Sequence, residues 1–168
     1  MWGHSSAGRA FDWQSKGREF DPPWLHHLYL GMLSSQQRKA EIARLKVEAR
    51  ALELGVICSR PSIEGTRYDC ILDMLGKLYR AQIKYCDCAA GNSSGAIQLR
   101  LKSNVGHGAA RCYSEEEVDA LLVYIPSIGQ ICFFPQRIFC GKTGLNIRLK
   151  PARNGQHKRC VLAQDYFW

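Results

Sequence analysis

The stretch that most constrains this chain is YDCILDMLGKLYRAQIKY, residues 68–85, which has the pattern of a β-hairpin. Two runs rich in Ile, Leu and Tyr flank residues 74–77, where a glycine predicts a turn. Side chains alternate between the two faces of a strand, so Gln82 and Lys84 are predicted to share one face. The segment therefore predicts two antiparallel strands that carry a polar pair on one side.

An acid on the first of these strands, Asp69, can be brought beside that pair by the hairpin. Carboxylate and amide oxygens suit a hard divalent cation such as Mg²⁺ or Mn²⁺. An ammonium group beside the ion can orient a water molecule or stabilise the charge that develops on a phosphate. Asp73 is a rival acid, but it lies near the turn, where aspartate often stabilises the loop. We therefore prefer Asp69 as the acid of a candidate metal-dependent site with Gln82 and Lys84.

The order Asp69, Gln82, Lys84, with an Arg-Tyr pair just before the aspartate, resembles the PD-(D/E)XK nuclease core, Asp…(Glu or Gln)-x-Lys. With glutamine in the middle position, the pattern is similar to that of bacterial group I intron homing endonucleases built on this fold. The resemblance covers about residues 39–135. It implies an α/β fold with a restriction-endonuclease-like core, in which helices flank a mixed β-sheet. We expect a basic, β-rich C-terminal extension beyond that core.

The resemblance also implies an activity, which is the Mg²⁺-dependent, site-specific cleavage of double-stranded DNA. By this likeness, Asp69 and the carbonyl oxygen of Gln82 would hold the ion, and Lys84 would orient or activate the water. Symmetric cutting of a duplex needs at least two active sites, so a homo-oligomer is expected, either a dimer or a tetramer.

A helix is predicted upstream, at residues 35–54, by apolar residues that recur at steps of three and four positions. Serine can cap its start and glycine its end. The apolar positions are Ile42, Leu45, Ala49 and Leu52.

Charged residues are predicted to lie on the opposite side of this helix. In the family that the chain resembles, the helix presents a glutamate near the metal, and here Arg44 stands at that position. Glu48, one turn later, or Glu41, one turn earlier, could reach the same metal. Solvated helix charges are the alternative for both. We slightly prefer Glu48 as a third metal-binding and catalytic residue.

Basic residues further along the chain are candidates for DNA contacts. Residues 96–103 alternate apolar and polar positions, so this strand can lay a basic face on nucleic acid, or it can be an ordinary half-exposed strand. From residue 136 onward, arginine and lysine are frequent, which suggests an arm that contacts phosphates. The candidates are Arg100, Lys102, Arg137, Lys142, Arg148, Lys150 and Arg153.

The net charge of +8 and the pI of about 9.2 agree with a polyanionic partner, although a merely basic surface gives the same values. Residues 1–31 carry three Lys or Arg and three Asp or Glu, so the excess belongs to residues 32–168. This leading segment has no helical or strand period and resembles a translated transfer-RNA gene, with possible codons for all four arms in order. We expect it to be a non-native or disordered leader before a nuclease domain at 32–168.

Eight cysteines without a signal-peptide pattern predict reduced thiols and a cytoplasmic protein, associated with the nucleoid of a bacterium or located in an organelle. No apolar run is long enough to cross a bilayer. A structural zinc site is the less favoured alternative, because the ligand spacing is poor. Its ligands would be Cys86, Cys88, His107 and Cys112.

Two other functions remain open from the sequence. A Holliday-junction resolvase or repair nuclease shares the same core but recognises DNA shape. A catalytically decayed module that only binds nucleic acid is the other alternative, and the arginine at position 44 favours it.

Overall fold

Two β-sheets, one long helix and two short helical segments make up the part of the chain that the structure describes. This computed structural model describes residues 34–63, 65–88, 95–102, 111–151 and 161–168. The leader expected at residues 1–31 lies outside this part. Within it, no helix is both long enough and apolar enough to span a membrane.

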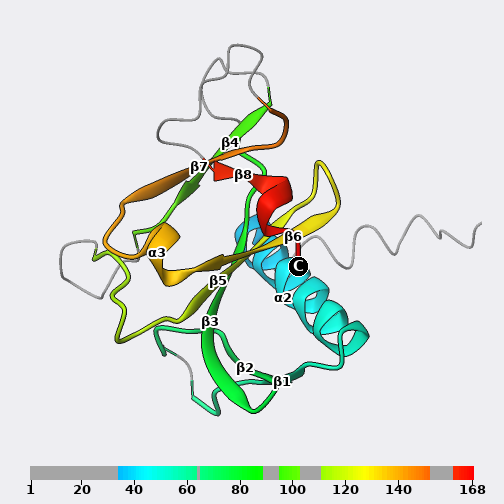
Figure 1. Ribbon diagram of the computed structural model, residues 1–168, viewed down its shortest axis with the longest axis vertical. Helices are drawn as coiled ribbons and strands as arrows, with labels where there is room; N and C mark the ends of the chain where they lie inside the picture. Colours follow the sequence, from blue (N-terminus) through cyan, green and yellow to red (C-terminus); the bar gives the residue numbers. More distant parts are fainter. Residues whose placement is uncertain (1–33, 64, 89–94, 103–110, 152–160) are drawn as a thin grey trace, which may run out of the picture. The chain divides into compact units, whose positions relative to one another are not determined.

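The larger sheet has five strands in the order β1-β2-β3-β5-β6 (Figure 1). All neighbours are antiparallel except β3 and β5, which are parallel, so the sheet is mixed as predicted. The strands are β1 (Ile57–Ser59), β2 (Cys70–Met74), β3 (Lys77–Tyr85), β5 (Ala120–Ile125) and β6 (Gln130–Pro135).

The predicted hairpin is confirmed as β2 and β3, joined by a two-residue turn. Met74 pairs with Lys77, so the turn residues are Leu75 and Gly76. Both have positive φ, 55° for Leu75 and 77° for Gly76. A turn of this hand matches the right-handed twist of the strands that it joins, which explains why the hairpin is tight.

Helix α2 (Ser35–Glu53) packs on one face of this sheet, close to its predicted bounds. The predicted apolar face was wrong. The helix buries Ala43, Val47 and Ala51 and leaves Leu45 and Leu52 exposed. Small alanine side chains let the helix approach a sheet whose own residues supply the bulk of this core. The core residues of the sheet are Cys70, Leu72, Ala81, Ile83, Ala120, Leu122 and Ile131.

The smaller sheet has three strands in the order β4-β7-β8. Strand β4 (Ala96–Arg100) is antiparallel to β7 (Gly144–Arg148), which is parallel to β8 (Val161–Leu162). The predicted C-terminal extension is therefore β-rich. Its strands pair with a strand from the middle of the chain, which the sequence pattern did not predict.

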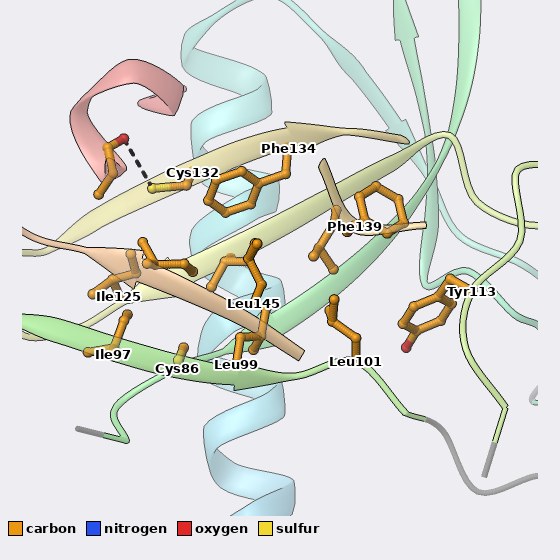
Figure 2. Close-up of a cluster of buried hydrophobic side chains, with 14 of the residues drawn as sticks. Cys86, Ile97, Leu99, Leu101, Tyr113, Ile125, Cys132, Phe134, Phe139 and Leu145 are labelled. Atoms are coloured by element: carbon orange, nitrogen blue, oxygen red, sulfur yellow. Dashed lines mark hydrogen bonds between the residues drawn. The ribbon is translucent and has the colours of Figure 1, made fainter. Parts of the chain in front are cut away.

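A second core lies between the inner face of the smaller sheet and the face of the larger sheet opposite α2. Figure 2 shows Leu99 and Leu145 of the smaller sheet, together with Ile125 and Phe134 of the larger one, in this cluster. The short helix α3 (Gln136–Phe139) adds Phe139. Successive residues of β5 point alternately into the two cores, so this strand contributes side chains to both.

The C-terminal aromatic residues pack on their own chain. The ring of Tyr166, in the 3₁₀ helix η1 (Ala163–Tyr166), lies 4.9 Å from that of Phe134, and the ring of Trp168 lies 6.4 Å from that of Phe133. Nε of Arg50, on α2, donates a hydrogen bond to the Trp168 carbonyl oxygen at 2.9 Å. The chain end is thus tied to both the sheet and the helix.

Candidate active site

Asp69 lies one residue before β2, where the hydrogen-bonded ladder between β2 and β3 ends. Its Oδ2 atom accepts a hydrogen bond from the backbone N–H of Ile83 at 2.7 Å. The carboxylate therefore takes a backbone donor of β3 two residues beyond the last paired residue, Ala81. This contact fixes the acid against the C-terminal half of β3.

Gln82 completes the contact between the two strands. Its side chain is 9% exposed and is the only buried polar one in the described part of the chain. The Nε2 group donates hydrogen bonds to Oδ2 of Asp69 and to the Ile83 carbonyl oxygen, the latter at 3.4 Å. An ionised carboxylate only accepts hydrogen bonds, so the amide turns its NH₂ group toward it. The predicted convergence of the acid and the amide is present in the structure.

Lys84 lies two residues further along β3, on the same face as Gln82. Residues 81 and 83 of the same strand are buried in the core under α2, so the predicted alternation is correct. The Lys84 ammonium lies 5.9 Å from the centroid of the Tyr113 ring. Its charge also acts on the Asp69 carboxyl group. An acid, an amide and an ammonium group therefore lie together on the face opposite α2.

Asp69 is exposed as a residue, but protein atoms crowd around its carboxyl group. Burial raises the pKa of Asp69 above its ordinary value, which is the largest effect. The hydrogen bond from Ile83 and the positive charge of Lys84 lower the pKa of Asp69 and partly offset that effect. A bound cation would favour the ionised form in the same way as Lys84 does.

The donor atoms at this site fit a hard cation. The hydrogen bonds of Asp69 use its Oδ2 atom, and those of Gln82 use its Nε2 atom. Oδ1 of Asp69 and Oε1 of Gln82 take no part in these hydrogen bonds. Oxygen ligands of this kind suit Mg²⁺ or Mn²⁺, and Mg²⁺ is commonly bound through one or two carboxylates together with waters and substrate phosphates. The described residues contain no group of three or more His, Cys, Asp or Glu side chains that could hold a metal.

The alternative zinc site finds no support in the described residues. Cys86 and Cys88 are free thiols there, and His107 lies outside that part. The Cys86 thiol is buried and approaches the Gln98 carbonyl oxygen at 3.6 Å. Its burial raises the pKa to about 11, so the group is a neutral core thiol.

Asp73 and Asp119 have structural partners. Asp73 accepts the backbone N–H of Gly76 at 3.2 Å, which is the turn-stabilising role that the sequence suggested. Asp119 accepts two hydrogen bonds from the Arg80 side chain, at 2.8 and 2.9 Å, and one from the Arg80 backbone at 2.8 Å. These bonds hold the start of β5 against β3.

Glu48 lies on α2, on the other side of the sheet from Gln82 and Lys84. Its Oε1 atom accepts hydrogen bonds from Arg44 Nη1 and Arg60 Nε, both at 2.7 Å, and its Oε2 atom accepts one from Arg60 Nη2 at 3.2 Å. Arg44 also pairs with Glu41, and that hydrogen bond lowers the pKa of the Glu41 carboxyl group. The two helix acids thus belong to an ion-pair cluster centred on Arg44, whereas Asp69 has a different set of partners.

Of the predicted DNA-contacting residues, Arg100 and Arg148 lie on strands of the smaller sheet, and Lys102 and Lys150 follow those strands. Arg100, Lys102 and Lys150 are exposed, and Arg148 is half-buried. Arg137 is exposed on α3, and Nζ of Lys142 donates a hydrogen bond to the Ile138 carbonyl oxygen at 2.7 Å. Arg153 lies outside the described residues.

Tyr113 is the residue near this site that sequence reasoning missed. Its ring is 2% exposed, packs edge-on against Phe139 and faces two cations. These are Lys84 and Arg67, whose guanidinium carbon lies 5.2 Å from the ring centroid. No local period marks this tyrosine, because its contacts come from residues far from it along the chain.

Known proteins are similar to this chain in sequence pattern and in fold. A family model described as PD-(D/E)XK endonuclease matches residues 34–168. Among solved structures, the chain is similar to one titled as the structure of a bacterial homing endonuclease, I-Ssp6803I. That likeness has a TM-score of 0.64 and 21% sequence identity, and it covers 80% of this chain and 89% of the other. No curated protein matches the chain.

Proposed function

The chain belongs to the PD-(D/E)XK endonuclease family, and we propose that it is a site-specific endonuclease that hydrolyses phosphodiester bonds of double-stranded DNA, of the homing type. The observation that carries this proposal is the meeting of Asp69, Gln82 and Lys84 on one face of the β2–β3 hairpin. These are the residue types and the order that the family pattern requires.

Asp69 and Gln82 would bind a divalent cation, Mg²⁺ or Mn²⁺, through Oδ1 and Oε1. The ion would supply Lewis-acid stabilisation of the phosphate and a more acidic water. Asp69 is held for this role by the Ile83 N–H and by the amide of Gln82, so its carboxylate does not have to reorganise. Lys84 would orient the attacking water, or stabilise the negative charge that grows on the phosphate.

Glu48 is proposed as the third acid, a role that would require its carboxylate to leave its arginine partners and to move from the helix side of the sheet to the face that carries Gln82 and Lys84. One carboxylate and one amide bind a hard cation weakly, and Mg²⁺ then keeps several waters. A second carboxylate would tighten the site. Arg60, at 2.7 Å, comes from outside the helix and is the partner that Glu48 would have to release. A scissile phosphate near Arg60 would offer that arginine a replacement anion.

A homo-oligomer is proposed because cutting both strands of a duplex symmetrically requires two active sites. The outer face of α2 offers an apolar stripe for the contact between subunits. Its members are large and exposed: Ile42 by 37%, Leu45 by 53% and Leu52 by 78%. Apolar side chains in a row on a helix surface are commonly buried by a partner.

Cleavage of a DNA library tests this proposal. The full-length chain is incubated with random genomic duplex fragments that include DNA spanning the insertion site of its own gene, with Mg²⁺ or with EDTA, and the new ends are sequenced. We expect metal-dependent cuts at one recurring sequence, and no cuts by Asp69→Asn. Cuts confined to four-way junctions would favour a resolvase. Binding without cleavage in every metal would favour the decayed module, for which Arg44 at the family's acid position is the supporting observation.

A further inference from the structure

The outer face of the smaller sheet carries a regular set of polar side chains. On β4 and β7, residues 97, 99, 145 and 147 point into the core, so alternate residues point away from it. The strands are in register, with Gln98 opposite Asn146, Ala96 opposite Arg148, and Arg100 opposite Gly144. Gln98, Asn146 and Arg100 are exposed. We call these two strands the β4–β7 ribbon.

The order of side chains along this face is arginine, a pair of amides, then arginine. Each arginine lies opposite a small residue, alanine or glycine, so the long side chains do not crowd each other. Lys102 follows β4 and Lys150 follows β7, at opposite ends of the antiparallel ribbon, and both are exposed. The face therefore has amides at its centre and positive charge around them.

A face that only attracts phosphates would need positive charge but no amides. Side-chain amides match the N6 and N7 edge of adenine in the major groove, and arginine matches the O6 and N7 edge of guanine. A two-stranded β-ribbon is one of the shapes that this groove admits. β4 and β7 form such a pair over five residues, and β8 is added beside Ile147 and Arg148 only. The five-residue ribbon rises about 14 Å at ~3.4 Å per residue. That length corresponds to roughly four base steps of ~3.4 Å each.

The backbone of the ribbon is held firmly where it carries the amides. The Gln98 N–H donates a hydrogen bond to the Cys88 carbonyl oxygen at 3.1 Å, and the Gln98 carbonyl oxygen accepts the Cys86 thiol at 3.6 Å. On the other strand, Leu145 and Ile147 are buried on either side of Asn146. Recognition groups on a rigid strand lose little conformational freedom on binding.

We propose that the β4–β7 ribbon enters the major groove of the DNA substrate, and that Gln98 and Asn146 read adenine-containing base pairs. Arg100 and Arg148 flank them and contact guanine or the neighbouring phosphates. The inference deepens the proposed function, on which it rests, because it assigns sequence recognition to a surface separate from the hairpin that carries Asp69.

The test is selection of binding sites from a duplex library with a randomised central segment, carried out in Ca²⁺ with the full-length chain. Wild type is compared with Gln98→Ala and Asn146→Ala, and with Gln130→Ala as the control. Gln130 is an exposed amide at the start of β6, outside the ribbon. Melting curves check that all variants fold, which is expected because the changed side chains are exposed.

We expect Gln98→Ala and Asn146→Ala each to lower discrimination at one or two A·T pairs by about 5- to 150-fold, since a bidentate base contact contributes ~1–3 kcal/mol. Affinity for random-sequence DNA should stay within about twofold, and Gln130→Ala should keep the wild-type preference. Unchanged preferences in both ribbon variants, or a uniform loss on all sequences, would overturn the proposal.

Cleavage by wild type in Mg²⁺ is measured separately on the selected sites. A wild type that cuts its selected site while both ribbon variants keep its preference refutes the ribbon and leaves the nuclease intact. If wild type never cuts, but both ribbon variants change the selected sequence preference, the result refutes the nuclease activity and supports the ribbon.

Discussion

The Lys84 ammonium group lies 5.9 Å from the centroid of the buried Tyr113 ring, on the side of the sheet where Asp69 meets Gln82. Arg67, two residues before Asp69, faces the same ring at 5.2 Å and donates a hydrogen bond to Glu117 at 3.2 Å. An aromatic face attracts cations through its quadrupole. Tyr113 therefore contacts two positive groups, and one of them, Lys84, acts on the Asp69 carboxyl group.

Replacing Tyr113 by leucine should slow cleavage by about 2- to 30-fold, because a cation–π contact contributes ~0.5–2 kcal/mol. Tyr113→Phe keeps the ring and should cut at nearly the wild-type rate. Phe139→Leu is the control for lost packing, since it changes the edge-on partner but not the cation contact. Single-turnover rates on the selected duplex, below the melting temperature of each variant, measure the effect. Equal slowing in the Tyr113→Leu and Phe139→Leu variants would show that only packing matters.

Glu48 offers a second test of the site, because it is shared between two arginines. If it binds the metal during the reaction, Glu48→Gln should reduce cleavage by about 10²-fold or more while DNA binding survives. Arg60→Ala removes one of its partners and should lower the Mg²⁺ concentration that gives half-maximal cleavage. A Glu48→Gln protein that cuts normally and only melts earlier would restrict Glu48 to the ion-pair cluster.

Leu75 provides a test of the hairpin, since it holds a φ of 55° and its side chain is fully exposed. The left-handed conformation costs a residue with a Cβ about 1 kcal/mol, and asparagine tolerates it better. Leu75→Asn should therefore raise the free energy of unfolding by about 1 kcal/mol, measured by chemical denaturation. Gly76→Ala is the matched control and should lower the free energy of unfolding. Space for a methyl group is available there, but the φ of 77° is unfavourable for alanine. A Leu75→Asn protein that is less stable than wild type would contradict this reading.

Local patterns predicted the elements that depend on local chemistry. Alternation and a turn glycine predicted the β2–β3 hairpin, and the same alternation predicted that Gln82 and Lys84 share a face. The contact between Asp69 and Ile83 did not follow from the pattern, because the acid lies just outside the strand, where alternation no longer fixes its direction.

Pairing between distant segments could not be predicted in the same way. Strand β4 was expected, but its partner β7 lies far along the chain, and nothing in either strand identifies the other. On α2, the sequence pattern predicts that large apolar residues form the buried stripe, yet the helix buries the small residues Ala43 and Ala51 against the sheet instead. The fit between the helix and the surface of the sheet determines which face is buried, and the sequence of the helix alone does not reveal that surface.

The exposed stripe on α2 predicts the oligomer. Leu45→Lys and Leu52→Lys should each shift the protein toward monomer in sedimentation velocity, because a buried charge at an apolar interface is costly. Stability of the isolated fold should change by no more than ~0.5 kcal/mol, since both side chains are exposed. Leu75→Lys, on a leucine at the hairpin turn that is more exposed than either, is the control. An unchanged sedimentation coefficient in both helix variants would place the subunit contact elsewhere.

The buried carboxyl group of Asp69 should make the folded protein less stable as the pH rises, and a bound metal ion should offset that loss. Burial raises its pKa in the folded protein, so between its unfolded pKa of about 3.9 and its folded pKa the folded state binds more protons. The contribution of Asp69 is therefore most favourable below that window and declines as the pH rises through the folded pKa. In EDTA, the free energy of unfolding of Asp69→Asn should increase relative to that of wild type as the pH rises through this window. Above the window, the difference should stay constant.

Mg²⁺ should reverse this order near neutral pH, because the cation binds the ionised carboxylate and binds the folded state alone. At ten times its Kd, a single ligand adds about 1.4 kcal/mol to the free energy of unfolding. Wild type should gain this increment, whereas Asp69→Asn should gain little. Lys84→Ala is the comparison, because removing a neighbouring positive charge should make the ion bind more tightly while cleavage falls by about 10²- to 10³-fold. An equal gain in wild type and Asp69→Asn would mean that the ion binds elsewhere, and full cleavage by Asp69→Asn would remove Asp69 from the active site.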